Sequence, residues 1–177
     1  MSSVEDRSYP PLPEAVDTAR LRLPLVTSED AEGMRAGRRR VSWHPDYPRT
    51  EDQDAAALVR PDRILSTWGP RHIVRASDGQ VVGSIGFFGG PDTGDDDVPE
   101  AEVGFGLVAD ARGHGAVSEA LGALLTQADR VGVRVRAQVR PENRACLRVL
   151  AKCGFTRLRG TAEGGELVMV RPLPRTA

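Results

Sequence analysis

The stretch ADARGHGAVSEALGALL, residues 109–125, places two glycines, an arginine and a histidine directly before an apolar helical pattern. Alternating runs lie on either side of it, AEVGFGLV at 101–108 and VRVRAQV at 133–139, and predict strands. A strand, helix and strand joined by tight turns form a βαβ unit, so we expect the two strands to be parallel neighbours. One face of the helix is expected to be buried, with these residues inward: Val117, Leu121, Leu124, Leu125 and Ala128.

Further strands and helices follow from the rest of the sequence. RLRLPLV at 20–26 alternates, the Asp78-Gly79 turn indicates a hairpin between RHIVRA and QVVGSIGFFGG, and FTRLRG with ELVMVRPL predicts a closing hairpin. Helices are expected from Thr27 or Ser28, over 51–65 and over 143–153. The prediction is a single α/β domain of the α+β type over 18–174, after an extended arm at 1–17. Its sheet is mixed and mostly antiparallel, with one central βαβ unit and helices on both faces.

Composition narrows the class of protein. The 177 residues suit one domain. Their 24 basic and 25 acidic residues nearly cancel, which argues against nucleic acid as the main partner. No apolar run is long enough to span a membrane, and the first residues lack a signal-peptide core, so we expect a cytoplasmic protein with no membrane partner.

The cysteines and histidines give two negative expectations. Cys146 and Cys153 are seven residues apart on a predicted helix, roughly 10 Å along its axis, which is too far for a disulfide. We therefore expect two buried thiols. His44, His72 and His114 are scattered without ligand spacing, so no metal site is predicted.

The glycine turn has two interpretations. It is an ordinary structural turn, in which glycine supplies unusual dihedral angles, or it is an anion cradle. Placement favours the cradle, because a helix N-terminus after a strand presents free amides, and Arg112 adds a forked donor. Two nucleotide motifs fail here: there is no Gly-Lys-Ser/Thr, and a dinucleotide fingerprint would need a glycine at Ser118 and an acid near Arg140.

RGHGAVSEALGALL, PENRACLRVLAKCGF and ARLRLPLVTSEDAE together resemble the GNAT acetyltransferase superfamily, in its ribosomal-protein-alanine N-acetyltransferase-like branch. The resemblance runs from about Ala19 to Pro172. The family's Arg/Gln-x-x-Gly-x-Gly/Ala signature is matched from Arg112 to Ala116, and Val117 departs from it. The later Asn-x-x-Ser-x-Arg-x-Leu-x-Lys-x-Gly-Phe segment carries Cys146 in place of serine and otherwise matches at Asn143, Arg148, Leu150, Lys152, Gly154 and Phe155.

The resemblance implies acetyl-CoA as co-substrate. It implies that backbone amides of the turn hold the CoA pyrophosphate, and that the preceding strand end, Leu107 and Val108, pairs with the pantetheine arm. Asn143 is a helix N-cap, a ligand contact, or both. Arg144, Arg148 and Lys152 form a positive stripe that is either solvated or in contact with the 3′-phosphate. The implied cofactor-binding residues are Leu107, Val108, Arg112, Gly113, His114, Gly115, Ala116, Val117, Asn143 and Arg148.

Acetyl transfer to an amine needs a group that takes the amine's proton and a way to stabilise the leaving thiolate. Glu102 shares a strand face with Gly104 and Gly106, which leaves an open floor for a ligand, so Glu102 is the candidate base. Its other interpretation is an exposed strand glutamate. Cys146 is the candidate acid, or else a small core residue. Many family members carry a tyrosine where this chain has Leu150.

Two further segments each allow a functional and a purely structural interpretation. Trp43–Pro48 is a wall of the substrate pocket or a packed loop. Asp95–Asp97 steers a cationic amine or is a solvated loop. Gly37–Arg40 is expected to be a charged helix end.

The sequence thus predicts an N-acetyltransferase that moves an acetyl group from acetyl-CoA to a primary amine by direct attack in a ternary complex. Two alternatives stay open: an acyl-CoA-binding sensor without catalysis, and a nucleotide-binding oxidoreductase. The acceptor is a small-molecule or peptide amine of unspecified kind, and a homodimer is the default assembly.

Overall fold

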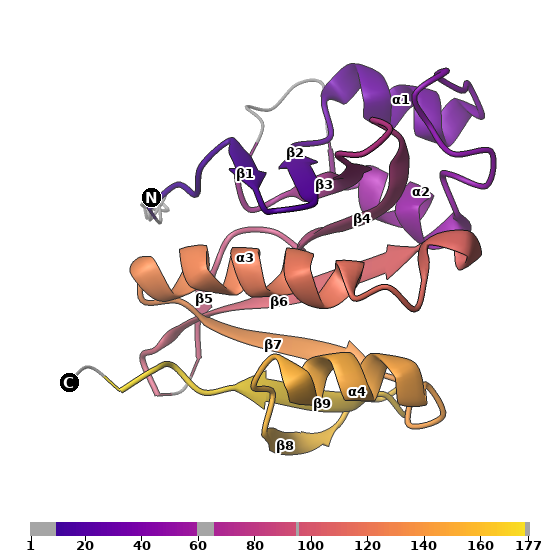
Figure 1. Cartoon of the computed structure of the whole chain (residues 1–177). Coiled ribbons are helices and arrows are strands. Elements are labelled where there is room, and N and C mark those ends of the chain that lie inside the picture. Colours follow the sequence, from indigo (N-terminus) through magenta and orange to yellow (C-terminus); the bar gives the residue numbers. More distant parts are fainter. Residues whose placement is uncertain (1–9, 60–65, 95, 176–177) are drawn as a thin grey trace.

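A computed structural model describes residues 10–59, 66–94 and 96–175 of the chain. Nine strands form one mixed sheet in the order β1-β2-β3-β4-β6-β7-β9-β8, and β5 pairs with β6 beside this path (Figure 1). Only the β6–β7 pair is parallel among these strands. The strands are β1 Ala15–Asp17, β2 Leu21–Pro24, β3 Pro70–Arg75, β4 Val81–Phe87, β5 Asp92–Thr93, β6 Pro99–Leu107, β7 Arg134–Val139, β8 Arg157–Thr161 and β9 Leu167–Arg171.

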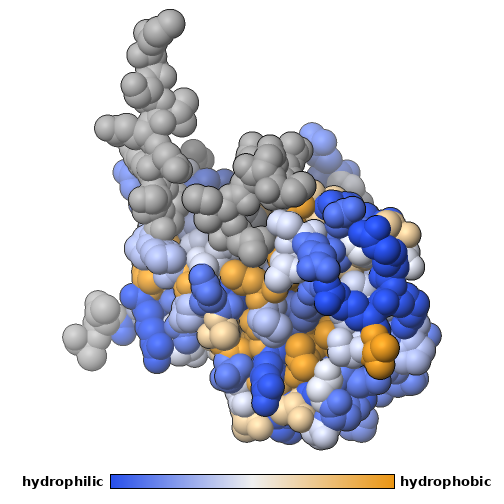
Figure 2. Space-filling model, turned by 90° about the horizontal axis from the view of Figure 1, so that it is seen from above, coloured by the Kyte–Doolittle hydropathy of each residue, from blue (hydrophilic) through white to orange (hydrophobic). Residues whose placement is uncertain are grey.

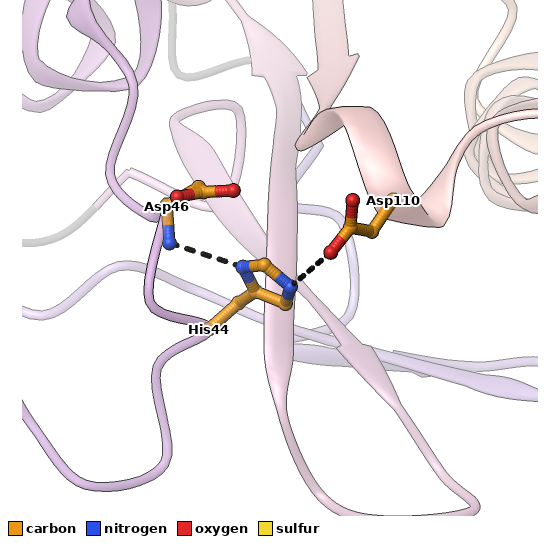
Figure 3. Close-up of side chains that lie close together, drawn as sticks. All are labelled: His44, Asp46 and Asp110. Atoms are coloured by element: carbon orange, nitrogen blue, oxygen red, sulfur yellow. Dashed lines mark hydrogen bonds and ion pairs between the residues drawn. The ribbon is translucent and has the colours of Figure 1, made fainter.

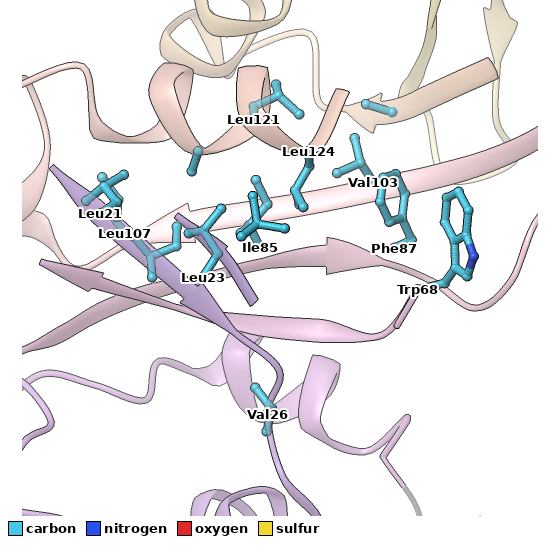
Figure 4. Packing of buried hydrophobic residues seen from close by; sticks show 14 of the residues in the cluster. Leu21, Leu23, Val26, Trp68, Ile85, Phe87, Val103, Leu107, Leu121 and Leu124 are labelled. Atoms are coloured by element: carbon cyan, nitrogen blue, oxygen red, sulfur yellow. The ribbon is translucent and has the colours of Figure 1, made fainter. Parts of the chain in front are cut away.

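The helices lie on both sides of the sheet, as expected. The long α3 crosses in front of β6 in Figure 1 and α4 lies in front of β7 and β9, whereas α1 and α2 gather at the β1–β4 half. Figure 4 shows α3 on one side of the central strands and the helical N-terminal part of the chain on the other. Their bounds are α1 Ser28–Ala36, α2 Thr50–Ala56, the 3-10 turn η1 Ala109–Ala111, α3 Ala116–Arg130 and α4 Arg144–Lys152.

Local signals place the helix ends. The Thr27 side chain caps α1 by accepting a hydrogen bond from the Asp30 amide, and Gly37 ends the helix in the left-handed region at φ +73°. The second predicted helix is too long, because α2 ends at Ala56 and only a turn follows it up to Val59. Residues 60–65 of that prediction lie outside the described residues.

The predicted βαβ unit is confirmed, with one feature that spacing does not reveal. β6 and β7 are in parallel register only from Glu100↔Arg134 to Glu102↔Arg136. Beyond these three rungs β6 continues to Leu107 and β7 to Val139 without pairing to each other, and the two strands diverge (Figure 1). The sheet therefore opens like a V in the middle of the molecule.

Apolar side chains from both halves of the sheet form one core. Leu121 and Leu124 of α3 pack down on Ile85, Val103 and neighbouring strand residues (Figure 4). Four of the five predicted inward positions of α3 are buried, and Val117 is half-buried because it lies in the first turn. Burying one of these leucine side chains stabilises the fold by about 1.5–3 kcal/mol.

The N-terminal segment is built into the domain more tightly than the predicted arm at 1–17 implies. Val16 of β1 is buried and pairs with Leu23. Arg71, 1% exposed, donates hydrogen bonds to four backbone carbonyls at distances of 2.7–3.1 Å, those of Pro13, Glu14, Leu23 and Thr67. The folded part therefore begins before residue 18.

The outer surface is mixed. Seen from above in Figure 2, hydrophilic side chains dominate the margin of the face and apolar ones reach the surface near its middle. Among the residues described, no helix is both long and apolar enough to cross a bilayer.

Candidate active site

The glycine turn takes the shape of an anion cradle. Gly113 and Gly115 lie in the left-handed region, at φ +84° and +76°, and Gly115 is the N-cap of α3 without any capping side chain. Within the described part of the chain, the amides of Ala116, Val117 and Ser118 have no acceptor. Free amides at the positive end of a helix suit a phosphate.

Two cavities adjoin in front of this turn and along the divergent strands. The smaller, of about 580 Å³, is lined by the turn, the end of β6 and α4. The larger, of about 860 Å³, runs between β6 and β7 and reaches α2. The residues that line both are Arg49, Glu51, Phe105, Asn143 and Cys146.

Most of the predicted cofactor-binding residues come together at the smaller cavity. Its lining includes Leu107, Arg112, Gly113, Gly115, Ala116, Val117, Asn143 and Arg148. His114 is exposed and lines neither cavity. Of the predicted positive stripe, Arg148 and Lys152 line this cavity and Arg144 does not.

The backbone groups of β6 that could pair with the pantetheine arm are not those of the predicted residues. The Val108 amide donates to Val82 and its carbonyl accepts from Ala111, while the Leu107 carbonyl accepts from Arg112 Nε at 3.1 Å. These groups of the predicted pair, Leu107 and Val108, are therefore occupied. Alternation along β6 instead turns the backbone of Phe105 away from β4 and toward the opening, beyond the last rung with β7.

The start of α4 brings two predicted residues together. The Asn143 side chain accepts a hydrogen bond from the Cys146 amide at 3.1 Å, so its role as N-cap is confirmed. Cys146 and Cys153 are free thiols, as predicted, but both are half-buried rather than buried, because α4 lies beside the opening. Burial raises the pKa of the Cys146 thiol, which therefore stays protonated at neutral pH.

Glu102 lies where the parallel pairing ends. Its carboxylate lines the larger cavity, and Arg136 Nε of β7 lies 3.4 Å from Oε1. The side chain is 19% exposed, so it is not the exposed strand glutamate of the alternative interpretation. A partly buried carboxylate in this place can accept a proton from a group in the larger cavity.

The open floor predicted above the two glycines of β6 is wrong. A Cβ at Gly104 would collide with the Phe88 ring, and a Cβ at Gly106 would collide with the guanidinium of Arg49. The glycines leave room for these side chains rather than for a ligand. Phe88 itself is 54% exposed and lines the larger cavity.

Arg49 is held by a buried carboxylate that was not among the predicted site residues. Asp52, fully buried, accepts hydrogen bonds from the Arg49 amide and from two nitrogens of its guanidinium, and Ser84 Oγ donates to it as well. The signal was an arginine followed three residues later by an acid at a helix start, a variant of the capping box.

A second ion-pair cluster joins β6 and β7 at the end where these two strands still pair. Glu100, 5% exposed, accepts hydrogen bonds from Arg134, Arg136 and Arg159 at 2.6–2.9 Å. Burial alone would raise the pKa of Glu100, but hydrogen bonds from these guanidinium groups lower it to about 2. Asp96 also pairs with Arg134 and lines neither cavity, so this member of the predicted steering loop is engaged in the ion-pair cluster, and Asp95 lies outside the described residues.

One of the three histidines, His44, lies in a group of side chains that could ligate a metal. Ligand atoms of His44, Asp46 and Asp110 lie within 4.8 Å of one another (Figure 3). The Asp46 amide donates to His44 Nδ1, so the proton of the neutral ring is on Nε2, which faces Asp110 at 3.4 Å. This tautomer favours a hydrogen bond to Asp110 over a metal at Nε2.

The loop at 43–48 is packed into the core and lines neither cavity. Trp43 and Tyr47 are at most 4% exposed, and the Tyr47 hydroxyl contacts His72 Nδ1 at 2.9 Å. His72 Nε2 in turn contacts Asp30 at 3.0 Å, and this hydrogen bond is the largest cause of the lowered pKa of Asp30. Arg40, from the predicted basic segment, pairs with the same carboxylate.

Comparisons with known proteins agree with this geometry. The model of the acetyltransferase (GNAT) domain family matches residues 20–156. No curated protein matches the sequence. Among solved structures, RimJ of Mycobacterium smegmatis in complex with CoA-disulfide has 24% identity and a TM-score of 0.60, covering 89% of this chain and 87% of that one.

Two further solved structures share the fold. RimL, a ribosomal L7/L12 alpha-N-protein acetyltransferase in complex with coenzyme A, has 18% identity and a TM-score of 0.61, covering 89% of this chain and 96% of its own. The ribosomal-protein-S5-alanine acetyltransferase of Vibrio fischeri has 16% identity and a TM-score of 0.58, with coverage of 88% and 93%. At such identities the likeness shows a shared fold.

Proposed function

Because this chain belongs to the GNAT acetyltransferase family, we propose that it moves an acetyl group from acetyl-CoA to a primary amine by direct attack in a ternary complex. One observation carries the proposal. A cradle of free helix amides opens onto a cavity lined by the end of β6, beyond its last rung with β7, so an anionic group and an extended arm find complementary partners in one cavity.

The smaller cavity is proposed to hold acetyl-CoA. The amides at the start of α3 would hold the pyrophosphate, and Arg148 with Lys152 would neutralise further phosphate charge. Phe105 offers its free backbone groups to the arm in the manner of an added strand. Bound acetyl-CoA supplies the activated acetyl group.

Glu102 is proposed as the base. An amine in the larger cavity must lose a proton before or during attack, and the Glu102 carboxylate lines that cavity directly. Its pairing with Arg136 fixes the position of the carboxylate at the last rung between β6 and β7. Glu102 acts directly or through one water.

The leaving thiolate has two proposed fates. Cys146 lines both cavities with a thiol that burial keeps protonated, so it can donate a proton where the two meet. Alternatively the thiolate leaves without a dedicated acid, and Cys146 is a small packing residue. Substituting Cys146 by alanine separates these cases, since only the first predicts a loss of kcat.

The acceptor is proposed to be a small-molecule or peptide amine. The RimL and Vibrio fischeri proteins are ribosomal-protein acetyltransferases. This likeness supports an amine on a protein as one possible kind of acceptor. The proposed setting is the cytoplasm, and a homodimer is the default assembly.

Isothermal titration with acetyl-CoA, CoA, ATP and NADH tests the proposal first. Micromolar binding of acetyl-CoA and CoA, without binding of ATP or NADH, is the expected outcome. An amine library is then screened for release of free thiol, which Glu102→Gln should slow by about 10²–10³-fold without altering acetyl-CoA affinity. Tight acetyl-CoA binding without thiol release on any amine favours the sensor, and NADH binding favours the oxidoreductase.

A further inference from the structure

Arg49, at the start of α2, lies across the sheet at the point where the two cavities meet. Its guanidinium rests on the backbone of Gly106, where any side chain on β6 would collide with it. Gly106 in turn is the cross-strand partner of Ser84 on β4. The guanidinium therefore lies against Gly106 in the central sheet.

Asp52 fixes the orientation of the Arg49 guanidinium. Asp52 Oδ2 accepts from Arg49 Nε at 2.9 Å and Oδ1 accepts from Nη2 at 2.8 Å, a bidentate pair. Ser84 Oγ also donates to Asp52 Oδ1, so both oxygens of this buried carboxylate accept hydrogen bonds. Such a locked guanidinium loses little further freedom when it binds a ligand.

One edge of the guanidinium stays available. Nη1 of Arg49 has no hydrogen-bond partner in the described part of the chain, and the side chain is 19% exposed. Arg49 lines both cavities, together with Phe105, whose backbone faces the same opening. Its charge is already offset by Asp52, so Nη1 offers a directed N–H donor more than a net positive charge.

We propose that Arg49 binds the acyl-pantetheine arm of the co-substrate by donating from Nη1 to one of its carbonyl oxygens, and that Asp52 is the positioning residue for this contact. The inference rests on the proposed function, which places the arm along β6. A carbonyl oxygen fits better than a phosphate, because the free amides proposed to hold phosphate belong to the first turn of α3, whereas Arg49 also lines the larger cavity and is already paired with Asp52.

The test compares three ligands by isothermal titration on wild-type protein and Arg49→Gln. Adenosine 3′,5′-bisphosphate lacks the arm, CoA has the arm, and acetyl-CoA adds the thioester carbonyl. The variant should bind the bisphosphate as the wild type does and bind acetyl-CoA about tenfold more weakly, the value of one hydrogen bond to a charged donor. An equal loss for CoA assigns an amide carbonyl of the arm, and a loss for acetyl-CoA alone assigns the acetyl carbonyl.

Two further variants protect the test against misfolding. Arg49→Gln leaves Asp52 buried without its cation, so the double variant Arg49→Gln with Asp52→Asn removes both charges and should show the same ligand pattern. Asp52→Asn alone should weaken acetyl-CoA binding less than Arg49→Gln does, with Arg49 still present but less firmly held. Thermal unfolding of each variant checks that the domain is intact.

The proposal is overturned if the folded variants bind acetyl-CoA as tightly as the wild type, or if they lose affinity equally for the bisphosphate. The first result makes Arg49 a structural ion pair, and the second makes it a phosphate contact. Failure of the wild type to bind any of the three ligands would instead refute the proposed function itself.

Discussion

The two adjoining cavities differ sharply in charge although they share five lining residues. The smaller is lined by four basic side chains and one acidic one: Arg49, Arg112, Arg148, Lys152 and Glu51. The larger is lined by two basic side chains, Arg49 and Arg140, and five acidic ones, Glu51, Asp52, Asp54, Glu102 and Glu166. The contrast separates a region suited to phosphates from one suited to an ammonium group, and the predictions below test that separation.

The largest effect is expected at the cradle. Gly115→Trp places an indole over the free amides of α3 and forces a bulky residue to φ +76°, so acetyl-CoA affinity should fall more than 100-fold (about 3 kcal/mol) in a titration. Gly122→Ala is the matched control, because a Cβ there meets open space within the same helix. It should stabilise the fold by roughly 0.5–1 kcal/mol and leave binding unchanged. Normal binding by Gly115→Trp would return the glycine turn to a purely structural role.

On the acidic side, Glu102→Gln should lower kcat by about 10²–10³-fold at neutral pH, because the amide cannot accept the amine's proton. The dissociation constant of acetyl-CoA should stay within twofold of the wild type. Steady-state kinetics with the best amine from the library, together with titration, measure both quantities. If Glu102→Gln kept the kcat of the wild type, another group would accept the amine's proton and Glu102 would be only a structural partner of Arg136.

The Glu100 ion-pair cluster joins β6 to β7 where the two strands still pair. Its contribution to the free energy of unfolding of the protein should depend on pH. The pKa of Glu100 is lowered from 4.5 to about 2 on folding, so its stabilisation is fully present above pH 4.5 and is lost as pH falls toward 2. About 2 kcal/mol of unfolding free energy should disappear over that window. Urea unfolding at a series of pH values should show the slope, and Glu100→Gln should flatten it. An equal slope in that variant would trace the effect to other carboxylates.

Charge reversals on the two sides should have separable effects of the smallest size. Arg148→Glu should weaken CoA binding about fivefold, and more at low salt, because an exposed phosphate contact is screened. Glu166→Arg should leave CoA affinity unchanged and lower kcat/KM for dicationic amines a few-fold relative to monoamines. If each reversal affects both ligands equally, the charge contrast has no functional meaning.

Features that depend on local sequence pattern could be predicted from the sequence. The βαβ unit, the Asn143 cap and the glycine cradle all follow from residues close together in the chain. The divergence of β6 from β7 does not, since both strands keep alternating after their pairing ends. Nor does the contact of Arg49 with Gly106, which joins residues 57 positions apart and inverts the expectation of an empty floor.

The buried Arg71 has a consequence for where the domain can be cut. The family match begins at residue 20, yet two of the four carbonyls around this guanidinium belong to Pro13 and Glu14. Burial already lowers the pKa of Arg71 to about 10, and no carboxylate accepts from it among the described residues. A chain shortened to the matched region would keep the cation and lose half its acceptors. We therefore expect the shortest unit that folds on its own to begin at or before Pro13, several residues upstream of the matched region, because Arg71 in β3 needs those carbonyls.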